Sequence, residues 1–153
     1  MRVFRMRLTY RRRAKWLGVL GVVMAMSVAC DFGHSTPTAP DQSTVQFSVT
    51  DLNVGTGTVA AAGNTANVTY GIWLYSDSAP DHKGTQEQGG SFAFVLGAKQ
   101  VIQGFDMAVT GMAVGGTRRA IVPPGLAYGS TGDGGAIPPN AALVFDIQLN
   151  SIQ

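Results

Sequence analysis

The feature that most constrains this fold is a glycine- and proline-rich connection over residues 127–140, AYGSTGDGGAIPPN. It lies between an apolar run that ends at Val122 and a second one from Leu143 to Leu149, and it has neither helical nor strand periodicity. Compact domains rarely contain a connection of this length unless the loop has a function. Its apolar residues, Tyr128 and Ile137, are held between glycines and a Pro-Pro pair. We therefore expect a shaped apolar flap rather than a solvated linker.

Charge is divided unevenly along the 153 residues of the chain. Hydrophobic residues make up 45% and charged residues 13%, which is enough for one globular domain after removal of a targeting segment. Seven of the eleven basic residues lie within residues 1–29. From Cys30 onward, four basic residues stand against all nine acidic ones, hence a net charge of −5, although the whole chain carries +2. This acidic part is expected to repel nucleic acid.

Residues 1–29 have the pattern of a secretory signal peptide. Residues 1–16 are basic, and Leu17 to Ala29 form an uncharged apolar run. A helix of that length rises only about 20 Å, which is too short for the roughly 30 Å hydrocarbon core of a bilayer. The alternative is a buried core helix, which the flanking cations disfavour.

Cys30, the only cysteine, lies at the expected cleavage site. Residues 27–30, SVAC, resemble a bacterial lipobox, which predicts lipidation of Cys30; the alternatives are a free buried cysteine and a plain cut near Ala29. A single cysteine cannot form an intramolecular disulfide. If Cys30 is lipidated, its two or three acyl chains would anchor the protein stably in the membrane. Residues 30–44, rich in Ser, Thr and Pro, are predicted to be a disordered tether. We therefore expect a protein of the bacterial cell envelope that meets the membrane through its lipid anchor only.

Residues 45–153 are predicted to form one α+β domain. Alternating apolar residues predict five strands, at Val45–Val49, Val68–Tyr75, Ser91–Leu96, Thr117–Val122 and Leu143–Leu149. Residues 76–90 are predicted to be a polar loop. Apolar residues at helical spacing predict one short helix closed by Gly111 or Gly115; they are Ile102, Phe105, Val109 and Met112. We expect this helix to pack on the concave side of a bent antiparallel sheet.

Five segments of this domain, in order and in register, resemble the FKBP-type peptidyl-prolyl cis/trans isomerases. They are VIQGF at 101–105, VGGTRR at 114–119, LAYG at 126–129, IPPNA at 137–141 and LVFD at 143–146. The resemblance extends over about Val45 to Ile152. It implies a bent antiparallel β-sheet wrapped around one short α-helix, with an apolar pocket between them.

The same resemblance implies a set of site residues. The catalytic residues would be Tyr128, Ile102, Phe105 and Tyr70, and the substrate-binding residues would be Phe92, Val101, Ile137, Phe145, Ala136 and Asp133. Ile102 would offer its backbone N–H, and Tyr128 its hydroxyl, to the carbonyl oxygen of the bound residue. Phe105 stands where the family often has Trp, and Ala136 where a larger aliphatic residue is common. Taken singly, the aromatic residues would equally suit an ordinary core.

The chemistry implied by the resemblance needs no cofactor and no metal. Rotation about an Xaa-Pro bond is opposed by amide resonance, with a barrier of about 18–20 kcal/mol. A dry apolar pocket that fits the twisted imide lowers this barrier. The sequence thus predicts a monomeric peptidyl-prolyl cis-trans isomerase that assists the folding of proline-containing, exported polypeptides and binds macrolide ligands of the family.

One departure from the family supports an alternative function. Glu87 and Gln88 stand where the family usually has Phe-Asp, so one pocket wall and one carboxylate are expected to be missing. A domain without them would keep the fold and the peptide pocket but lose turnover. The alternative is therefore a non-catalytic peptide-binding or holdase module.

Overall fold

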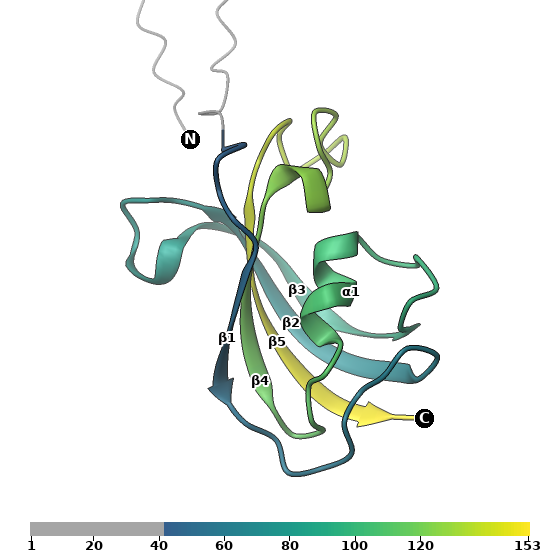
Figure 1. The fold of residues 1–153 in the computed structure, drawn as a ribbon. Coiled ribbons are helices and arrows are strands. Elements are labelled where there is room, and N and C mark those ends of the chain that lie inside the picture. The colour runs from purple at the N-terminus through teal and green to yellow at the C-terminus, as the bar shows by residue number, and fades with distance from the viewer. Residues whose placement is uncertain (1–41) are drawn as a thin grey trace, which may run out of the picture. The chain divides into compact units, whose positions relative to one another are not determined.

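The computed structural model describes residues 42–153. The predicted signal peptide, Cys30 and the tether up to residue 41 lie outside the described residues. Five strands form one sheet, and one α-helix lies against it (Figure 1). In chain order the elements are β1 (Ser48–Asn53), β2 (Thr65–Tyr75), the 3-10 turn η1 (Pro80–His82), β3 (Lys83–Val95), α1 (Gln103–Val109), β4 (Thr117–Val122), the 3-10 turn η2 (Pro124–Leu126) and β5 (Leu143–Ile152). In this range no helix combines the length and the apolar character that crossing a bilayer requires.

The sheet is antiparallel throughout, in the order β1-β4-β5-β2-β3. Strand β5 is therefore central, and β1 and β3 form the two edges. Figure 1 shows α1 on the concave side of the bent sheet. The predicted fold class, α+β with a bent antiparallel sheet around one short helix, is confirmed.

The core lies between α1 and the concave face of the sheet. Every second residue of β5 from Leu143 to Leu149 points into it and is at most 4% exposed. From the helix, Phe105 and Val109 face these strands and are 3% and 0% exposed. Gly104 allows α1 to approach β4 closely, since a Cβ at this position would lie only 2.2 Å from Cγ1 of Val122. The helix ends at Val109, earlier than the predicted apolar face, although Met112 beyond it is also buried.

Residues 76–90 were predicted to be a polar loop, and for residues 83–90 this prediction is wrong. Strand β3 begins at Lys83 and runs for 13 residues, so only the turn around η1 separates it from β2. The pairing places Gln88 opposite Ile72 and Gly90 opposite Tyr70. Residues 83–90 are thereby fixed as an edge strand beside the strand that carries Tyr70.

The predicted half-buried strand over Val45–Val49 is also displaced. Strand β1 begins at Ser48, and all six of its residues are exposed, including Val49 at 44%. Its position comes from pairing with β4, where Asp51 lies opposite Arg118 and forms an ion pair of 2.6 Å from Oδ1 to Nε of the arginine. The alternation of Val45, Phe47 and Val49 therefore does not mark the buried face of a strand.

Gln42 belongs to the domain rather than to the predicted tether. Its amide Nε2 donates to the backbone oxygen of Tyr75 at 3.0 Å, and its Oε1 accepts from the backbone N–H of Ala142 at 2.6 Å. The side chain thus joins the end of β2 to the residue before β5. Ordered contacts of the domain extend ahead of its predicted start at Val45.

Candidate functional site

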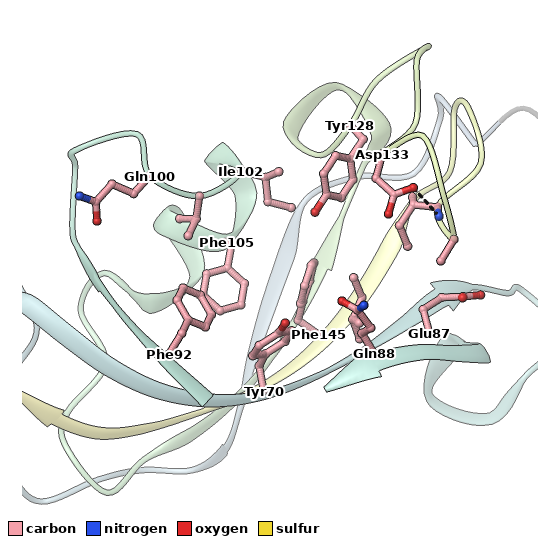
Figure 2. Close-up of a pocket in the computed structure, with 14 residues that line it drawn as sticks. Tyr70, Glu87, Gln88, Phe92, Gln100, Ile102, Phe105, Tyr128, Asp133 and Phe145 are labelled. Carbon is pink, nitrogen blue, oxygen red and sulfur yellow. Dashed lines mark hydrogen bonds between the residues drawn. The ribbon is translucent and has the colours of Figure 1, made fainter. Parts of the chain in front are cut away.

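A cavity of about 310 Å³ opens between α1, the flap of residues 127–140 and the concave face of the sheet (Figure 2). It is lined by Tyr70, Ile72, Glu87, Gln88, Phe92, Gln100, Val101, Ile102, Phe105, Tyr128, Asp133, Ala136, Ile137 and Phe145. All ten predicted site residues are among these fourteen. The fold brings them together from β2, β3, the residues just before α1, α1 itself, the flap and β5, while their roles in binding and catalysis stay predictions.

The floor of the cavity is aromatic, with Phe105 of α1 at its centre. The Phe105 ring meets Phe145 of β5 edge-on at a centroid distance of 5.2 Å, and it meets Tyr70 of β2 edge-on at 5.8 Å. Phe92 of β3 lies 5.7 Å from Phe105 and 5.5 Å from Tyr70. The Phe92 and Phe105 rings are tilted by 33°, whereas the other three pairs are edge-to-face, a favoured arrangement of aromatic rings. Because Phe105 and Phe145 are only 3% and 4% exposed, the floor of the cavity is also the top of the hydrophobic core.

The hydrogen-bonding groups of the cavity that have no partner among residues 42–153 include the hydroxyls of Tyr70 and Tyr128 and the backbone N–H of Ile102. Figure 2 shows both hydroxyls directed into the space above the aromatic floor. Partial burial, and then the negative charge of Asp133, raise the pKa of Tyr128 above its ordinary value. Its hydroxyl therefore keeps its proton at neutral pH and can donate a hydrogen bond.

The flap is held in shape by its own backbone hydrogen bonds. Asp133 accepts two of them at Oδ1, from the N–H groups of Gly135 and Ile137, both at 2.8 Å. These bonds hold the pKa of Asp133 below its ordinary value, so the carboxylate is charged at neutral pH. At the base of the flap, the N–H of Asn140 donates to the oxygen of Gly129 at 2.8 Å, where a positive φ of 60° suits glycine. The turn buries Ile137 to 5% exposure and leaves Ala136 exposed at the rim.

Four lining residues were absent from the predicted site: Ile72, Glu87, Gln88 and Gln100. The alternation of β2 could have identified Ile72, which shares a strand face with Tyr70. Glu87 and Gln88 enter the site because β3 continues through them, which corrects the expectation of a missing wall. The wall is present, but it is polar and carries the carboxylate of Glu87. Gln100 lies in the loop before α1, where its Oε1 accepts from the N–H of Val95 at 2.9 Å, and no local pattern points to it.

Within the described range, no three His, Cys, Asp or Glu side chains lie close enough together to hold a metal ion. The site offers an aromatic floor, the unpartnered hydroxyls of Tyr70 and Tyr128, the unpartnered backbone N–H of Ile102 and a hydrogen-bonded flap. This arrangement can enclose a small apolar ring and bind a carbonyl oxygen beside it.

Comparison with known proteins identifies the family. Residues 57–150 match the family model for FKBP-type peptidyl-prolyl cis-trans isomerase. The 46 kDa FK506-binding nuclear protein of Spodoptera frugiperda is 41% identical over 106 residues, which are 69% of this chain and 25% of that protein. FK506-binding protein 4 of Neurospora crassa is 39% identical over 120 residues, which are 78% of this chain and 25% of that protein. The chain thus spans about a quarter of the length of these two relatives.

The fold agrees with a solved structure. The crystal structure of AtFKBP13 matches with a TM-score of 0.60 at 28% identity, over 70% of this chain and 93% of that one. The residues that the family model matches, 57–150, include the helix, the flap and all fourteen residues that line the cavity. The chain belongs to the FKBP-type peptidyl-prolyl cis-trans isomerase family.

Proposed function

We propose that this domain catalyses the cis/trans isomerisation of Xaa-Pro bonds. Membership of the family supports the proposal, and the observation that carries it is the composition of the cavity. An aromatic floor lies directly below a tyrosine hydroxyl and near a backbone N–H that have no partner among the described residues. Unpartnered donors beside an apolar floor are suited to a ligand that carries a carbonyl next to an apolar ring, as a prolyl peptide does.

The barrier to isomerisation arises from amide resonance, which rotation must break. The prolyl ring would rest on Phe105 and Phe145, and Ile102 N–H and the Tyr128 hydroxyl would hold the carbonyl oxygen of the bound residue. A twisted imide has lost its resonance and is less polar than the planar form, so a dry aromatic floor favours it over the ground state. Each 1.36 kcal/mol gained in the twisted state alone gives about a tenfold faster reaction.

The test is a comparison of two Tyr→Phe variants in an isomerisation assay on short Xaa-Pro peptides. Tyr128→Phe removes the hydroxyl that faces the cavity and keeps the ring, and we expect kcat/KM to fall about three- to tenfold, the value of one hydrogen bond. Tyr75→Phe is the matched control, because the hydroxyl of Tyr75 donates to Asp77 at 2.7 Å, outside the cavity. Equal rates for both variants would exclude the Tyr128 hydroxyl from the reaction. Absence of any rate above background in the folded domain would refute the proposed activity.

The polar wall of Glu87 and Gln88 favours a second function. The apolar enclosure of a twisted imide is less complete with Glu87 and Gln88 than with the Phe-Asp pair usual in the family, so the domain would bind prolyl segments but turn them over poorly. It would then act as a holdase or an adaptor. Peptide binding in the micromolar range without isomerisation would establish this alternative.

We further propose a lipid-anchored, monomeric form in a bacterial envelope, acting on exported polypeptides and open to macrolide ligands of the family. The location is supported only by two features of the sequence, the basic and apolar pattern of residues 1–29 and the presence of Cys30. The two relatives named above are eukaryotic, and one is called a nuclear protein. Fractionation of cells that express Cys30→Ser tests the anchor: release from the membrane is expected, and unchanged membrane binding would refute it.

A further inference from the structure

The cavity carries negative charge at one end. Glu87 of β3 and Asp133 of the flap both line it, and none of the fourteen lining residues is Lys, Arg or His. Figure 2 shows the two acidic residues toward the same end, one above and one below the opening, with Gln88 beside Glu87. Gln100 lies at the opposite end, beyond the aromatic floor. A bound peptide would therefore meet an uncharged floor in the middle and two carboxylates on one side.

Neither carboxylate is neutralised by the rest of the described chain. The side chain of Glu87 forms no ion pair or hydrogen bond with residues 42–153. The carboxylate of Asp133 accepts hydrogen bonds only from backbone N–H groups, which orient it and leave its charge intact.

The basic residues of the domain lie elsewhere. Lys83 and Arg119 are bound to Asp146, and Arg118 is bound to Asp51. Lys99 directly precedes Gln100, which stands at the far end of the cavity from the two acids. We call Glu87 and Asp133 together the rim of the cavity. A cation on a bound peptide would thus be the nearest partner for the negative charge of this rim.

We propose that Glu87 and Asp133 are specificity-determining residues that select Xaa-Pro segments with a Lys or Arg next to the proline. This inference rests on the proposed peptide-binding function of the same cavity. A Lys or Arg flanking the ring would extend over the rim toward the two carboxylates, whereas a Glu there would be repelled by both. Attraction between exposed charges is weak for each pair and is screened within about 10 Å at 0.1 M salt. The preference should therefore be moderate and should decrease as salt is added.

The experiment uses matched peptides with Lys, Leu or Glu on either side of one proline. Their affinities are measured by fluorescence polarisation and their isomerisation rates by a protease-free assay, at about 20 mM and 500 mM salt. At low salt we expect the Lys peptide to bind about fivefold more tightly than the Glu peptide, with Leu between them. The ratio should approach one at high salt. Measuring affinity separately from rate keeps the inference testable if turnover is absent.

Two charge-removing variants assign the effect to the rim. Glu87→Gln and Asp133→Asn preserve the size of each side chain, and each should reduce the Lys-to-Glu affinity ratio about twofold. Asp77→Asn is the matched control, since Asp77 is an exposed acid outside the cavity, and it should leave the ratio unchanged. Circular dichroism confirms that each variant is folded.

Each outcome has a defined meaning. Equal affinities for the three peptides, or a ratio that both rim variants leave unchanged, would overturn the inference while leaving the proposed activity intact. Isomerisation absent for all peptides, with the Lys preference present in binding, would refute the catalytic proposal and support the rim selection. Failure of every peptide to bind would overturn both.

Discussion

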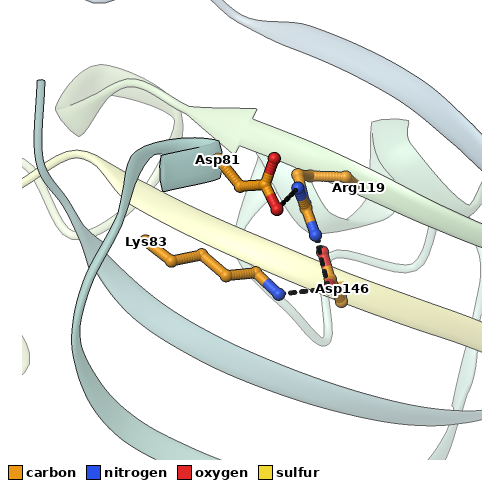
Figure 3. Close-up of polar contacts among 4 residues, drawn as sticks. All are labelled: Asp81, Lys83, Arg119 and Asp146. Atoms are coloured by element: carbon orange, nitrogen blue, oxygen red, sulfur yellow. Dashed lines mark hydrogen bonds and ion pairs between the residues drawn. The ribbon is translucent and has the colours of Figure 1, made fainter. Parts of the chain in front are cut away.

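The two faces of the sheet differ in how their polar groups are paired. On the concave face, two hydroxyls and one N–H line the cavity without a partner among residues 42–153. On the opposite face, four charged side chains, which we call the outer-face network, pair with one another; they are Asp81, Lys83, Arg119 and Asp146 (Figure 3).

Asp146 is the centre of the outer-face network. Its Oδ1 accepts from Nε of Arg119 at 2.7 Å and its Oδ2 from Nη2 of the same residue at 3.0 Å, across the β4–β5 pair. Lys83 also bonds to Asp146, and its Nζ lies 3.9 Å from the centroid of the Trp73 ring. Arg119 reaches Asp81 as well, at 2.9 Å from Nη1 to Oδ2. With Lys83, Arg119 and Asp146 only 16–22% exposed at their side chains, these contacts are partly shielded from water.

The difference indicates that the charged residues that stabilise the sheet and the polar groups that would bind a ligand lie on opposite sides of it. A hydroxyl that makes no bond within the protein and is partly exposed, such as that of Tyr128 at 39% exposure, can bond to water or to a ligand that displaces the water. Paired charges on the other face stabilise the pairing of β4 and β5, because they form their ion pairs with one another. Substitutions on the outer face should therefore affect unfolding and spare binding, and the reverse should hold for hydroxyls in the cavity.

The largest effect is expected at Phe105, where the separation breaks down because one ring serves both the core and the cavity floor. Phe105→Ala should lower the free energy of unfolding by about 3–5 kcal/mol and abolish peptide binding, since it opens a void at a residue that is 3% exposed. Urea denaturation measures the first effect and fluorescence polarisation the second. Phe105→Leu fills more of the void and should cost less. Loss of binding at unchanged stability would show that Phe105 is not part of the core.

The next largest effect is expected at Asp146. Asp146→Asn removes the charge that Arg119 and Lys83 share, and we expect a loss of about 2 kcal/mol in the free energy of unfolding, with peptide affinity unchanged. Urea denaturation at pH 7 measures the loss. Asp77→Asn serves as the control, since Asp77 is exposed and lies outside the network. A fall in peptide affinity with full stability would contradict the separation of the two faces.

The same residue predicts a pH dependence. Burial acts to raise the pKa of Asp146, but the bonds from Arg119 and Lys83 outweigh it and hold this pKa below its ordinary value. A carboxyl with a lowered folded-state pKa stabilises the fold above its unfolded pKa of about 3.9, and this contribution is lost as pH falls through the folded value. The stability difference between the parent and Asp146→Asn should therefore be full at pH 7 and shrink below about pH 4. A difference that is constant with pH would exclude this ionic origin.

The concave side of this molecule was predicted better than its edges, because the resemblance to the family implied the ten site residues and the periodicity of the sequence indicated most of the elements that carry them. Residues such as Phe105, Tyr128 and Phe145 lie in segments whose apolar period or glycine pattern is strong, and the structure brings them around one cavity. Strand β3 was missed between Lys83 and Gly90 because it is an edge strand rich in polar residues and glycine, most of them exposed. Such a strand has no buried face to generate alternation, and its place is set by pairing with β2. The pairing of β3 with β2 places Glu87 and Gln88 in the wall of the cavity. This pairing joins segments that are apart in the sequence, so no local sequence pattern could have predicted it.

Gln42 was missed for a different reason. Its two partners, Tyr75 and Ala142, lie 33 and 100 residues away along the chain, and its neighbours are polar. Tyr75 and Ala142 also bond to each other, from the N–H of Tyr75 to the oxygen of Ala142 at 2.9 Å. The Gln42 amide binds the other oxygen and N–H of this pair, and so completes the junction between β2 and β5 behind the flap.

The smallest of these effects is expected at this junction, which belongs to neither face. Gln42→Ala would leave the Tyr75 oxygen and the Ala142 N–H without their partner, and we expect a loss of about 1 kcal/mol in the free energy of unfolding. Hydrogen exchange at the Ala142 amide should accelerate more than exchange in the core strands, because this N–H would lose its Gln42 partner and Ala142 lies in the short link between the flap and β5. Gln46→Ala is the matched control, since the Gln46 side chain bonds only to the nearby Thr44 oxygen at 3.2 Å and is exposed. If Gln42→Ala accelerates exchange without changing peptide affinity, the flap keeps its shape through the Asp133 bonds alone; if affinity falls as well, the geometry of the cavity depends on the segment that enters the domain at Gln42.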